Sequence, residues 1–73
     1  MDKNELIKEQ MQLILWFNNY YLINEQKFRR LNTLNKLCDN GTSPYENLRI
    51  LYEEAEVKRA RIQEIEKLLG IEQ

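Results

Sequence analysis

The chain is most apolar at residues 11–23, which read MQLILWFNNYYLI. Ten of these thirteen residues are apolar or aromatic, whereas 32% of the whole chain is charged. On either side of this stretch, apolar residues return every three or four positions, which is the spacing of amphipathic helices. The pattern predicts two long helices, at about 3–37 and about 44–69, with a turn at 38–43 between them.

The second predicted helix has clear signals at both ends. Ser43 is expected to be its N-cap, with Pro44 at the first helical position and Glu46 completing a capping box. Gly70, followed by Ile71, is expected to stop the helix in a Schellman motif. The sequence therefore predicts a helix that begins at Pro44 and ends just before Gly70.

The first predicted helix has weaker signals. Asp2 is expected to cap its start, with Glu5 three residues later. Five asparagines fall within the predicted helix, and asparagine is a mediocre helix former. They are Asn18, Asn19, Asn24, Asn32 and Asn35. These positions leave room for a local irregularity.

Two amphipathic helices joined by a short turn predict an all-α fold, an antiparallel two-helix hairpin that resembles a coiled coil. Apolar residues recur seven positions apart in both helices. They are Ile7, Ile14, Tyr21 and Phe28 in the first helix and Leu48, Ala55, Ile62 and Leu69 in the second. We expect residues 1–73 to form this hairpin as a single domain.

The turn also predicts which residues face each other across the hairpin. A turn centred near residue 41 sets Tyr21 beside Ile62. The same register aligns the basic stretch 27–30 with the acidic run 53–56, so that opposite charges meet. This charge match supports the hairpin.

Four large side chains of the first helix fall on the side that points away from the second helix on a helical wheel. They are Leu15, Trp16, Leu22 and Ile23, and the pairs 15/22 and 16/23 are each seven residues apart. A helix that is apolar on all sides is normally buried on all sides. These residues are therefore the predicted partner-binding site, covered by another protein or by a second copy of the chain. The alternative is that the chain bends, or adds a short third helix, and buries them internally.

The composition narrows the remaining chemistry. The chain has no histidine and a single cysteine, Cys38, so an internal disulfide and a histidine–cysteine zinc site are both excluded. No glycine-rich phosphate loop is present, so we expect neither a cofactor nor enzymatic activity. A chain this short buries a small core, and we expect oligomerisation or a partner to supply further stability.

The apolar stretch does not predict a membrane protein. Thirteen residues are too few to cross a bilayer, which needs about 20. Residues 1–10 mix acids and bases, and no small-residue cleavage site follows, so no secretory signal is indicated. The lone Cys38 favours a reducing compartment. We therefore expect a cytoplasmic protein without a membrane span.

The basic stretches 27–30 and 58–61 allow an alternative function, a small nucleic-acid-binding regulator. Its contact residues would be Arg29, Arg30, Lys58, Arg59 and Arg61. An aromatic ring beside arginines can stack on a base while the cations hold phosphates. The net charge of −1 weighs against this function. Glutamates around 58–61 are also spaced to pair with these cations within the helix.

The chain length, the two helices around a turn and the pattern from Ser43-Pro44-Tyr45 to Leu69 together resemble the small co-chaperones of type III secretion needle subunits. The resemblance implies a hairpin that docks on a second, repeat-like chaperone and shields the needle subunit in the cytoplasm. We therefore expect a protein–protein interaction module, either a small helical co-chaperone or a regulator, that binds a partner through the apolar face of the first helix.

Overall fold

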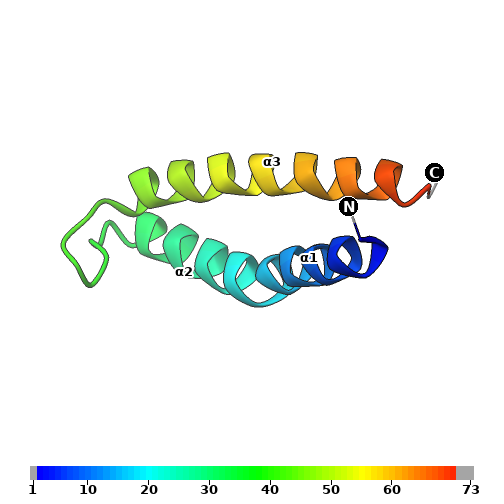
Figure 1. Cartoon of the computed structure of the whole chain (residues 1–73). Helices are drawn as coiled ribbons and strands as arrows, with labels where there is room; N and C mark the ends of the chain where they lie inside the picture. The colour runs from blue at the N-terminus through cyan, green and yellow to red at the C-terminus, as the bar shows by residue number, and fades with distance from the viewer. Residues whose placement is uncertain (1, 71–73) are drawn as a thin grey trace.

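The computed structural model describes residues 2–70, and every regular element in this part of the chain is a helix. Helix α1 spans Lys3–Leu15, the π-helix η1 spans Trp16–Tyr21, and α2 spans Leu22–Thr33. These three follow one another without a break and form the first arm of the molecule (Figure 1). Helix α3, Pro44–Leu68, forms the second arm. The prediction of an all-α fold built from two long helical segments is confirmed.

The two arms lie side by side in a rod of 46 × 17 × 17 Å. Residues 34–43 connect them at one end of the rod, and the described ends of the chain lie at the other (Figure 1). Helix α3 contacts all three elements of the first arm. The radius of gyration is 15.5 Å, whereas a compact chain of this length has a radius of about 11 Å. The molecule is therefore elongated, and each arm has one side turned away from the other.

Asp2 caps the first arm, as predicted. Its backbone is extended, with φ −69° and ψ 128°, and its carboxylate accepts a hydrogen bond from the Asn4 N–H at 3.1 Å. The N–H groups of Glu5 and Leu6 donate to the Asp2 carbonyl. These contacts satisfy N–H groups that have no partner inside the helix.

The first arm ends at Thr33, four residues before the predicted end at residue 37. Asn35 has a positive φ of 54°, a left-handed conformation that asparagine tolerates better than most residues. The Lys36 N–H donates to the Leu31 carbonyl at 2.9 Å, and the Asn35 N–H donates to the Asn32 carbonyl at 3.2 Å. These two bonds are those of a Schellman motif. An asparagine therefore stops this helix where the sequence pattern predicted that it would continue.

Helix α3 begins where predicted, but its N-cap works differently. Ser43 has the extended backbone of an N-cap, with φ −69° and ψ 130°, yet its side chain makes no capping hydrogen bond. Glu46 pairs instead with Arg49 at 2.9 Å. The predicted capping box is therefore wrong in its side-chain contacts.

The far end of α3 follows the prediction closely. Leu68 is the last helical residue, and Gly70 has a positive φ of 77°. The Gly70 N–H donates to the Lys67 carbonyl at 3.1 Å, as in the predicted Schellman motif. The expected contribution of Ile71 lies outside the described residues.

The middle of the first arm is a π-helix, and it contains Asn18 and Asn19, two of the asparagines that left room for an irregularity. The Leu22 N–H donates to the Phe17 carbonyl, five residues earlier. Such a turn holds about one more residue than an α-helical turn. The first arm curves away from α3 and lies furthest from it around η1 (Figure 1).

The buried core is small and lies mostly on α3. The buried residues in the described part of the chain are Leu6, Cys38, Pro44, Leu48, Leu51, Ala55 and Ile65. Ile65 is the one large side chain among them with no exposed surface. No side chain of η1 or α2 is buried to this degree. Apart from Leu6, the first arm therefore contributes half-buried side chains to a core that lies mostly on α3.

The predicted register between the arms is wrong. Tyr21 contacts Tyr52, with ring centroids 6.5 Å apart, and does not lie beside Ile62. Two features explain the shift. The connection is centred near residue 38 or 39 because α2 ends at Thr33, and the π-turn takes up an extra residue.

The predicted charge match across the hairpin is also absent from the described residues. Lys27 pairs with Asp39 at 3.6 Å, and Arg29 lies 3.9 Å from Glu25 on its own helix. The ion pair between the arms joins Glu9 to Arg61 instead. Among the described residues, no ion pair therefore joins the basic stretch 27–30 to the acidic run 53–56.

Candidate partner-binding surface

Helix η1 gathers four aromatic rings. Trp16 stacks on Tyr20 with centroids 5.6 Å apart and meets Phe17 edge-on at 4.9 Å. Tyr21 lies 5.5 Å from Phe17 and 5.8 Å from Trp16. Residues five apart in an α-helix point about 140° away from each other, so the contact between Trp16 and Tyr21 depends on the wider π-turn.

Two cations of α3 cover these rings from the second arm. The Lys58 Nζ lies 5.0 Å from the centroid of the Trp16 ring. The Arg59 Cζ lies 5.1 Å from the centroid of Phe17 and 5.7 Å from that of Tyr21. Each such contact at an exposed site contributes about 0.5–1 kcal/mol. The aromatic side of η1 therefore faces α3.

Trp16 consequently lies on the side of the first arm that faces α3. Its predicted position, on the side that points away from α3, is wrong. It is half-buried and contacts Lys58, whereas Ile23 is 65% exposed. The prediction assumed that residues seven apart share a face along the whole helix. Because the π-turn holds one more residue, the residues that share a face across η1 are eight apart. Leu15 therefore aligns with Ile23, and Ile14 with Leu22.

Large apolar side chains line the side of the first arm that points away from α3. We call this set the outward stripe, and its members are Ile7, Met11, Ile14, Leu15, Leu22 and Ile23, all of them exposed. Within α1 the stripe follows the four- and three-residue spacing of one helical face. Ile7 and Ile14, which were predicted to face the second helix, are 38% and 43% exposed. Three of the predicted partner-binding residues, Leu15, Leu22 and Ile23, belong to the stripe.

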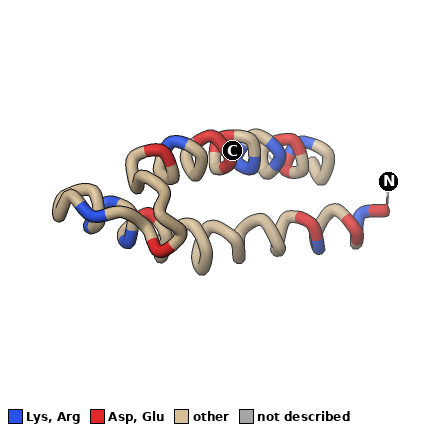
Figure 2. Tube along the Cα trace, turned by 90° about the vertical axis from the view of Figure 1, so that its left-hand side faces the viewer, with Lys and Arg blue, Asp and Glu red and all other residues tan. Residues whose placement is uncertain are grey.

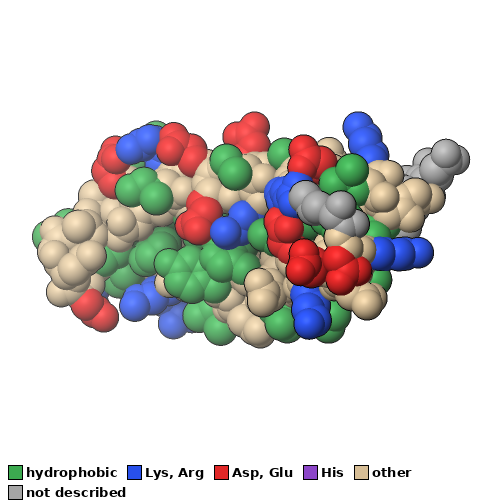
Figure 3. Space-filling view, in the orientation of Figure 1, with side chains coloured by type: hydrophobic (Ala, Val, Ile, Leu, Met, Phe, Trp, Pro, Cys, Tyr) green, Lys and Arg blue, Asp and Glu red, His purple; other side chains and the backbone are tan. Residues whose placement is uncertain are grey.

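Five of the six stripe residues, all but Ile7, lie on the longest uncharged segment of the chain. No residue from Gln10 to Asn24 carries a charge, and the middle of the first arm is uncharged along its length (Figure 2). Hydrophobic side chains gather between the arms towards the loop end, and others lie along the outer edge of the first arm (Figure 3). Between Leu15 and Leu22 of the stripe lie two exposed polar residues, Asn18 and Asn19.

The cations of the alternative nucleic-acid site are mostly engaged within the protein. Lys58 pairs with Glu54 at 3.6 Å, in addition to its contact with Trp16. Arg61 donates to both carboxylate oxygens of Glu9, at 2.6 and 2.9 Å, and to Glu64. The predicted pairs within the helix are therefore confirmed for Lys58 and Arg61.

Neighbouring charges and burial shift the pKa of several groups. Hydrogen bonding to Arg61 lowers the pKa of Glu9, and the same bond raises the pKa of Arg61. Burial raises the pKa of Tyr21, which donates to Glu25 at 3.0 Å. The pKa of Arg49 is raised mainly by its hydrogen bond to Glu46. Each shift moves the pKa further from 7, so each group keeps its ordinary charge at neutral pH.

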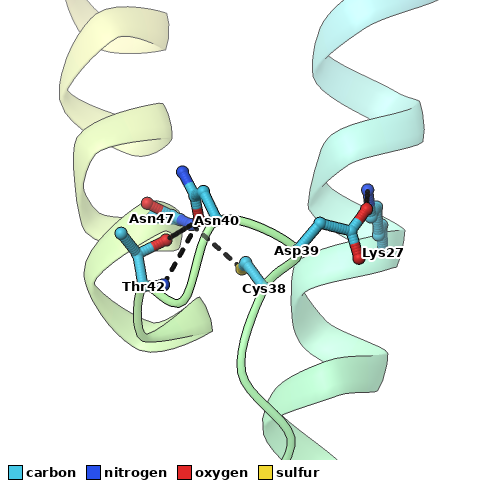
Figure 4. Close-up of polar contacts among 6 residues, drawn as sticks. All are labelled: Lys27, Cys38, Asp39, Asn40, Thr42 and Asn47. Carbon is cyan, nitrogen blue, oxygen red and sulfur yellow. Dashed lines mark hydrogen bonds and ion pairs between the residues drawn. The ribbon is translucent and has the colours of Figure 1, made fainter.

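Cys38 anchors the connection between the arms (Figure 4). Its thiol is buried, and the Asn47 side chain donates to its Sγ at 3.0 Å and to the Thr42 Oγ1 at 2.8 Å. The Thr42 N–H in turn donates to the Asn40 Oδ1 at 3.2 Å. Asn47, in the first turn of α3, therefore ties the connecting loop to the start of this helix. The Ser43 side chain makes no such contact with the helix.

Residues 2–70 hold no group of three or more potential metal ligands. Within the same range, none of the helices combines the length and the apolar character needed to cross a bilayer. Comparisons with protein families, with curated proteins and with solved structures found no match. The outward stripe is therefore the surface on which a functional interpretation depends.

Sequence reasoning missed half of this surface. Ile7, Met11 and Ile14 belong to the stripe but were not among the predicted site residues. The uncharged segment between Glu9 and Glu25, with an eight-residue repeat across the asparagine pair, could have indicated Met11 and Ile14, and Ile7 lies four residues before Met11. A seven-residue repeat selected Trp16 in their place.

Proposed function

We propose that this chain is a protein–protein interaction module, an antiparallel helical hairpin that binds a partner through the outward stripe of its first arm. The observation that carries the proposal is a run of six exposed apolar side chains on a helix face that the second arm does not cover. Exposed apolar patches of this kind mark interaction sites in soluble proteins. A partner helix would complete the packing around the first arm.

The exposed surface supports a docking role. The chain exposes 5765 Å² at a mass of 8.9 kDa, whereas a compact monomer of that mass exposes about 4,800 Å². The excess of roughly 950 Å² reflects the elongated shape of the molecule, in which the outward stripe stays accessible. Burying Leu15, Leu22 and Ile23 would contribute about 1.5–3 kcal/mol each before the cost of association is subtracted.

Binding rather than catalysis is the role we assign to the chain. A catalytic acid or base works best with a pKa near the working pH. The shifted groups of this protein move away from neutrality and are held in pairs, as Glu9 is with Arg61. The specific form of binding implied by the resemblance is co-chaperone activity in the cytoplasm, in which a docked hairpin shields an aggregation-prone protein.

Site-specific photo-crosslinking in the cells that naturally express the chain tests the proposal. A photoreactive amino acid at Ile23 should give a discrete adduct with a partner protein. The matched control is Val57 on α3, which is 70% exposed against 65% for Ile23. The Ile23 adduct should disappear when Leu15→Gln is added. An adduct that forms equally from Val57, or that survives Leu15→Gln, would contradict docking through the stripe.

A further inference from the structure

Cations stand at both ends of the outward stripe. Lys8 follows Ile7 directly at the α1 end, and Lys27 and Arg30 lie four and seven residues beyond Ile23 at the α2 end. All three cations are exposed. Among the described residues, Lys27 lies 3.6 Å from Asp39, and neither Lys8 nor Arg30 has an ion pair.

The carboxylates of the first arm lie elsewhere. Glu9 is bound to Arg61 of α3, and Glu25 accepts a hydrogen bond from Tyr21, whose ring contacts α3. Glu5 precedes Glu9 by one helical turn and so lies on the same flank. On the outward face of this arm, the apolar stripe therefore has cations at both of its ends.

We propose that the occupant of the outward stripe is an amphipathic helix of a different protein, with an apolar stripe flanked by acidic residues at both of its ends. This inference rests on the proposed function and specifies the partner's chemistry. Lys8 and Arg30 are 22 positions apart in the sequence, which corresponds to about 33 Å of helix. That distance exceeds the Debye length of about 8 Å at physiological ionic strength. Each cationic end therefore attracts charge independently of the other. The partner helix needs acidic residues at both of its ends.

A second copy of the chain fits this face poorly. In a parallel pairing, Lys8 of one copy would meet Lys8 of the other. In an antiparallel pairing, Lys8 would meet Arg30. Both orientations bring like charges together at both ends, and like-charge juxtaposition is what suppresses wrong partners at interfaces. The flanking cations therefore disfavour self-association through the stripe.

The centre of the stripe favours a protein over a lipid surface. Asn18 and Asn19 are exposed there, and neither side chain has a hydrogen bond to the described residues. Burying their amides among acyl chains would leave them without partners, which costs free energy. A facing helix can supply a polar side chain, as asparagine pairs do at the seams of coiled coils.

Two synthetic helical peptides test the charge selection on the full chain. Both carry the same apolar stripe with a central asparagine, and one has glutamates at both ends where the other has lysines. We expect the acidic peptide to bind at least roughly tenfold more tightly, with a difference that shrinks as salt is raised. Lys8→Glu combined with Arg30→Glu should reverse the preference. Equal binding of both peptides would leave the docking face in place and overturn the charge selection.

Binding of neither peptide would also overturn the inference, as would tighter binding to phosphatidylcholine vesicles that contain phosphatidylserine. The photo-crosslinking at Ile23 reports on the proposed function separately, because it does not depend on the partner's charge.

A designed gain of self-association gives an independent test. Gln26→Glu with Arg30→Glu places two carboxylates beside Lys27 and gives the α2 end of the stripe a net negative charge, so that it complements the Lys8 end in an antiparallel pair. Sedimentation should show dimers of this variant at concentrations at which the wild type is monomeric. The control, Gln26→Lys with Arg30→Lys, keeps the cationic end and should stay monomeric. Dimers of the wild type that dissociate on Leu15→Gln would show that a second copy is the occupant.

Discussion

The two arms meet solvent in different ways. On α3, charged residues pair with one another along the exposed side: Arg49 contacts Glu46 at 2.9 Å and Glu53 at 2.8 Å. Lys58 and Glu54 form a further pair one turn on. The exposed side of the first arm carries the outward stripe instead, and no charge between Glu9 and Glu25 interrupts it.

The exposed side of α3 is therefore mostly charged, whereas the exposed side of the first arm is mostly apolar. Helix α3 also exposes apolar side chains, such as Ile50 and Val57, but charged residues surround them in the sequence. Scattered exposed aliphatic residues are common and need no partner. Six on one side of a helical arm, five of them on an uncharged segment, are a different case, because together they form a continuous apolar area.

The arms also differ in regularity, and the irregular arm is the one that carries the outward stripe. Helix α3 is an unbroken α-helix of 25 residues. The first arm contains η1, which turns four aromatic rings towards α3 and sets the eight-residue repeat of the stripe on the other side. The π-turn therefore determines which apolar residues of the first arm pack against α3 and which stay exposed.

The largest expected effect contrasts a core residue of α3 with a stripe residue. Ile65 has no exposed surface, so Ile65→Ala should lower the free energy of unfolding by about 2–5 kcal/mol. Ile23→Ala should change it by less than about 0.5 kcal/mol. Urea unfolding at low protein concentration measures both. A loss at Ile23 as large as that at Ile65 would mean that the chain itself buries the stripe.

A second contrast concerns two arginines on different arms. Arg59 contacts the rings of Phe17 and Tyr21, so Arg59→Ala should cost about 1–2 kcal/mol for the two contacts. Arg30 has no such contact, and Arg30→Ala should be close to neutral. Thermal unfolding of the two variants distinguishes them. Equal midpoints would indicate that Arg59 does not hold the aromatic side of η1 against α3.

The start of α3 provides a smaller contrast. Asn47→Ala removes hydrogen bonds to Cys38 and Thr42 and should cost about 1 kcal/mol. Ser43→Ala should cost less than the typical 1 kcal/mol or so of an N-cap, because its side chain makes no capping bond. Chemical unfolding ranks the two. A larger loss for Ser43→Ala would restore the capping box that the sequence predicts.

The smallest effect is a pH dependence at the ion pair between the arms. Arg61 lowers the pKa of Glu9 in the folded protein below its usual value of 4.5. The pair therefore stabilises the fold above pH 4.5, and this contribution fades as the pH falls through the lowered pKa. The difference in free energy of unfolding between the wild type and Glu9→Gln should become smaller as the pH falls through that acidic range. A gap that stays constant down to pH 2 would show that Glu9 and Arg61 do not couple.

Periodicity predicted the helical fold, the start of α3 and the glycine that ends it, because those signals act within a few residues. Two local features made the predictions of the register and of the position of Trp16 wrong. Asn35 ends α2 in a left-handed conformation that a propensity scale does not reveal, and this shortens the first arm and shifts the register. The π-turn at η1 breaks the assumption of a constant rotation per residue, and it moved Trp16 to the side that faces α3.

The most direct test of the docking surface is the affinity of the acidic-flanked peptide for a variant whose stripe is polar. Met11→Gln, Leu15→Gln and Ile23→Gln together remove the apolar centre of the stripe without touching α3. We expect this variant to keep its helical circular dichroism and to bind the peptide at least roughly tenfold more weakly than the wild type. Unchanged affinity in a folded variant would contradict a binding role for the outward stripe.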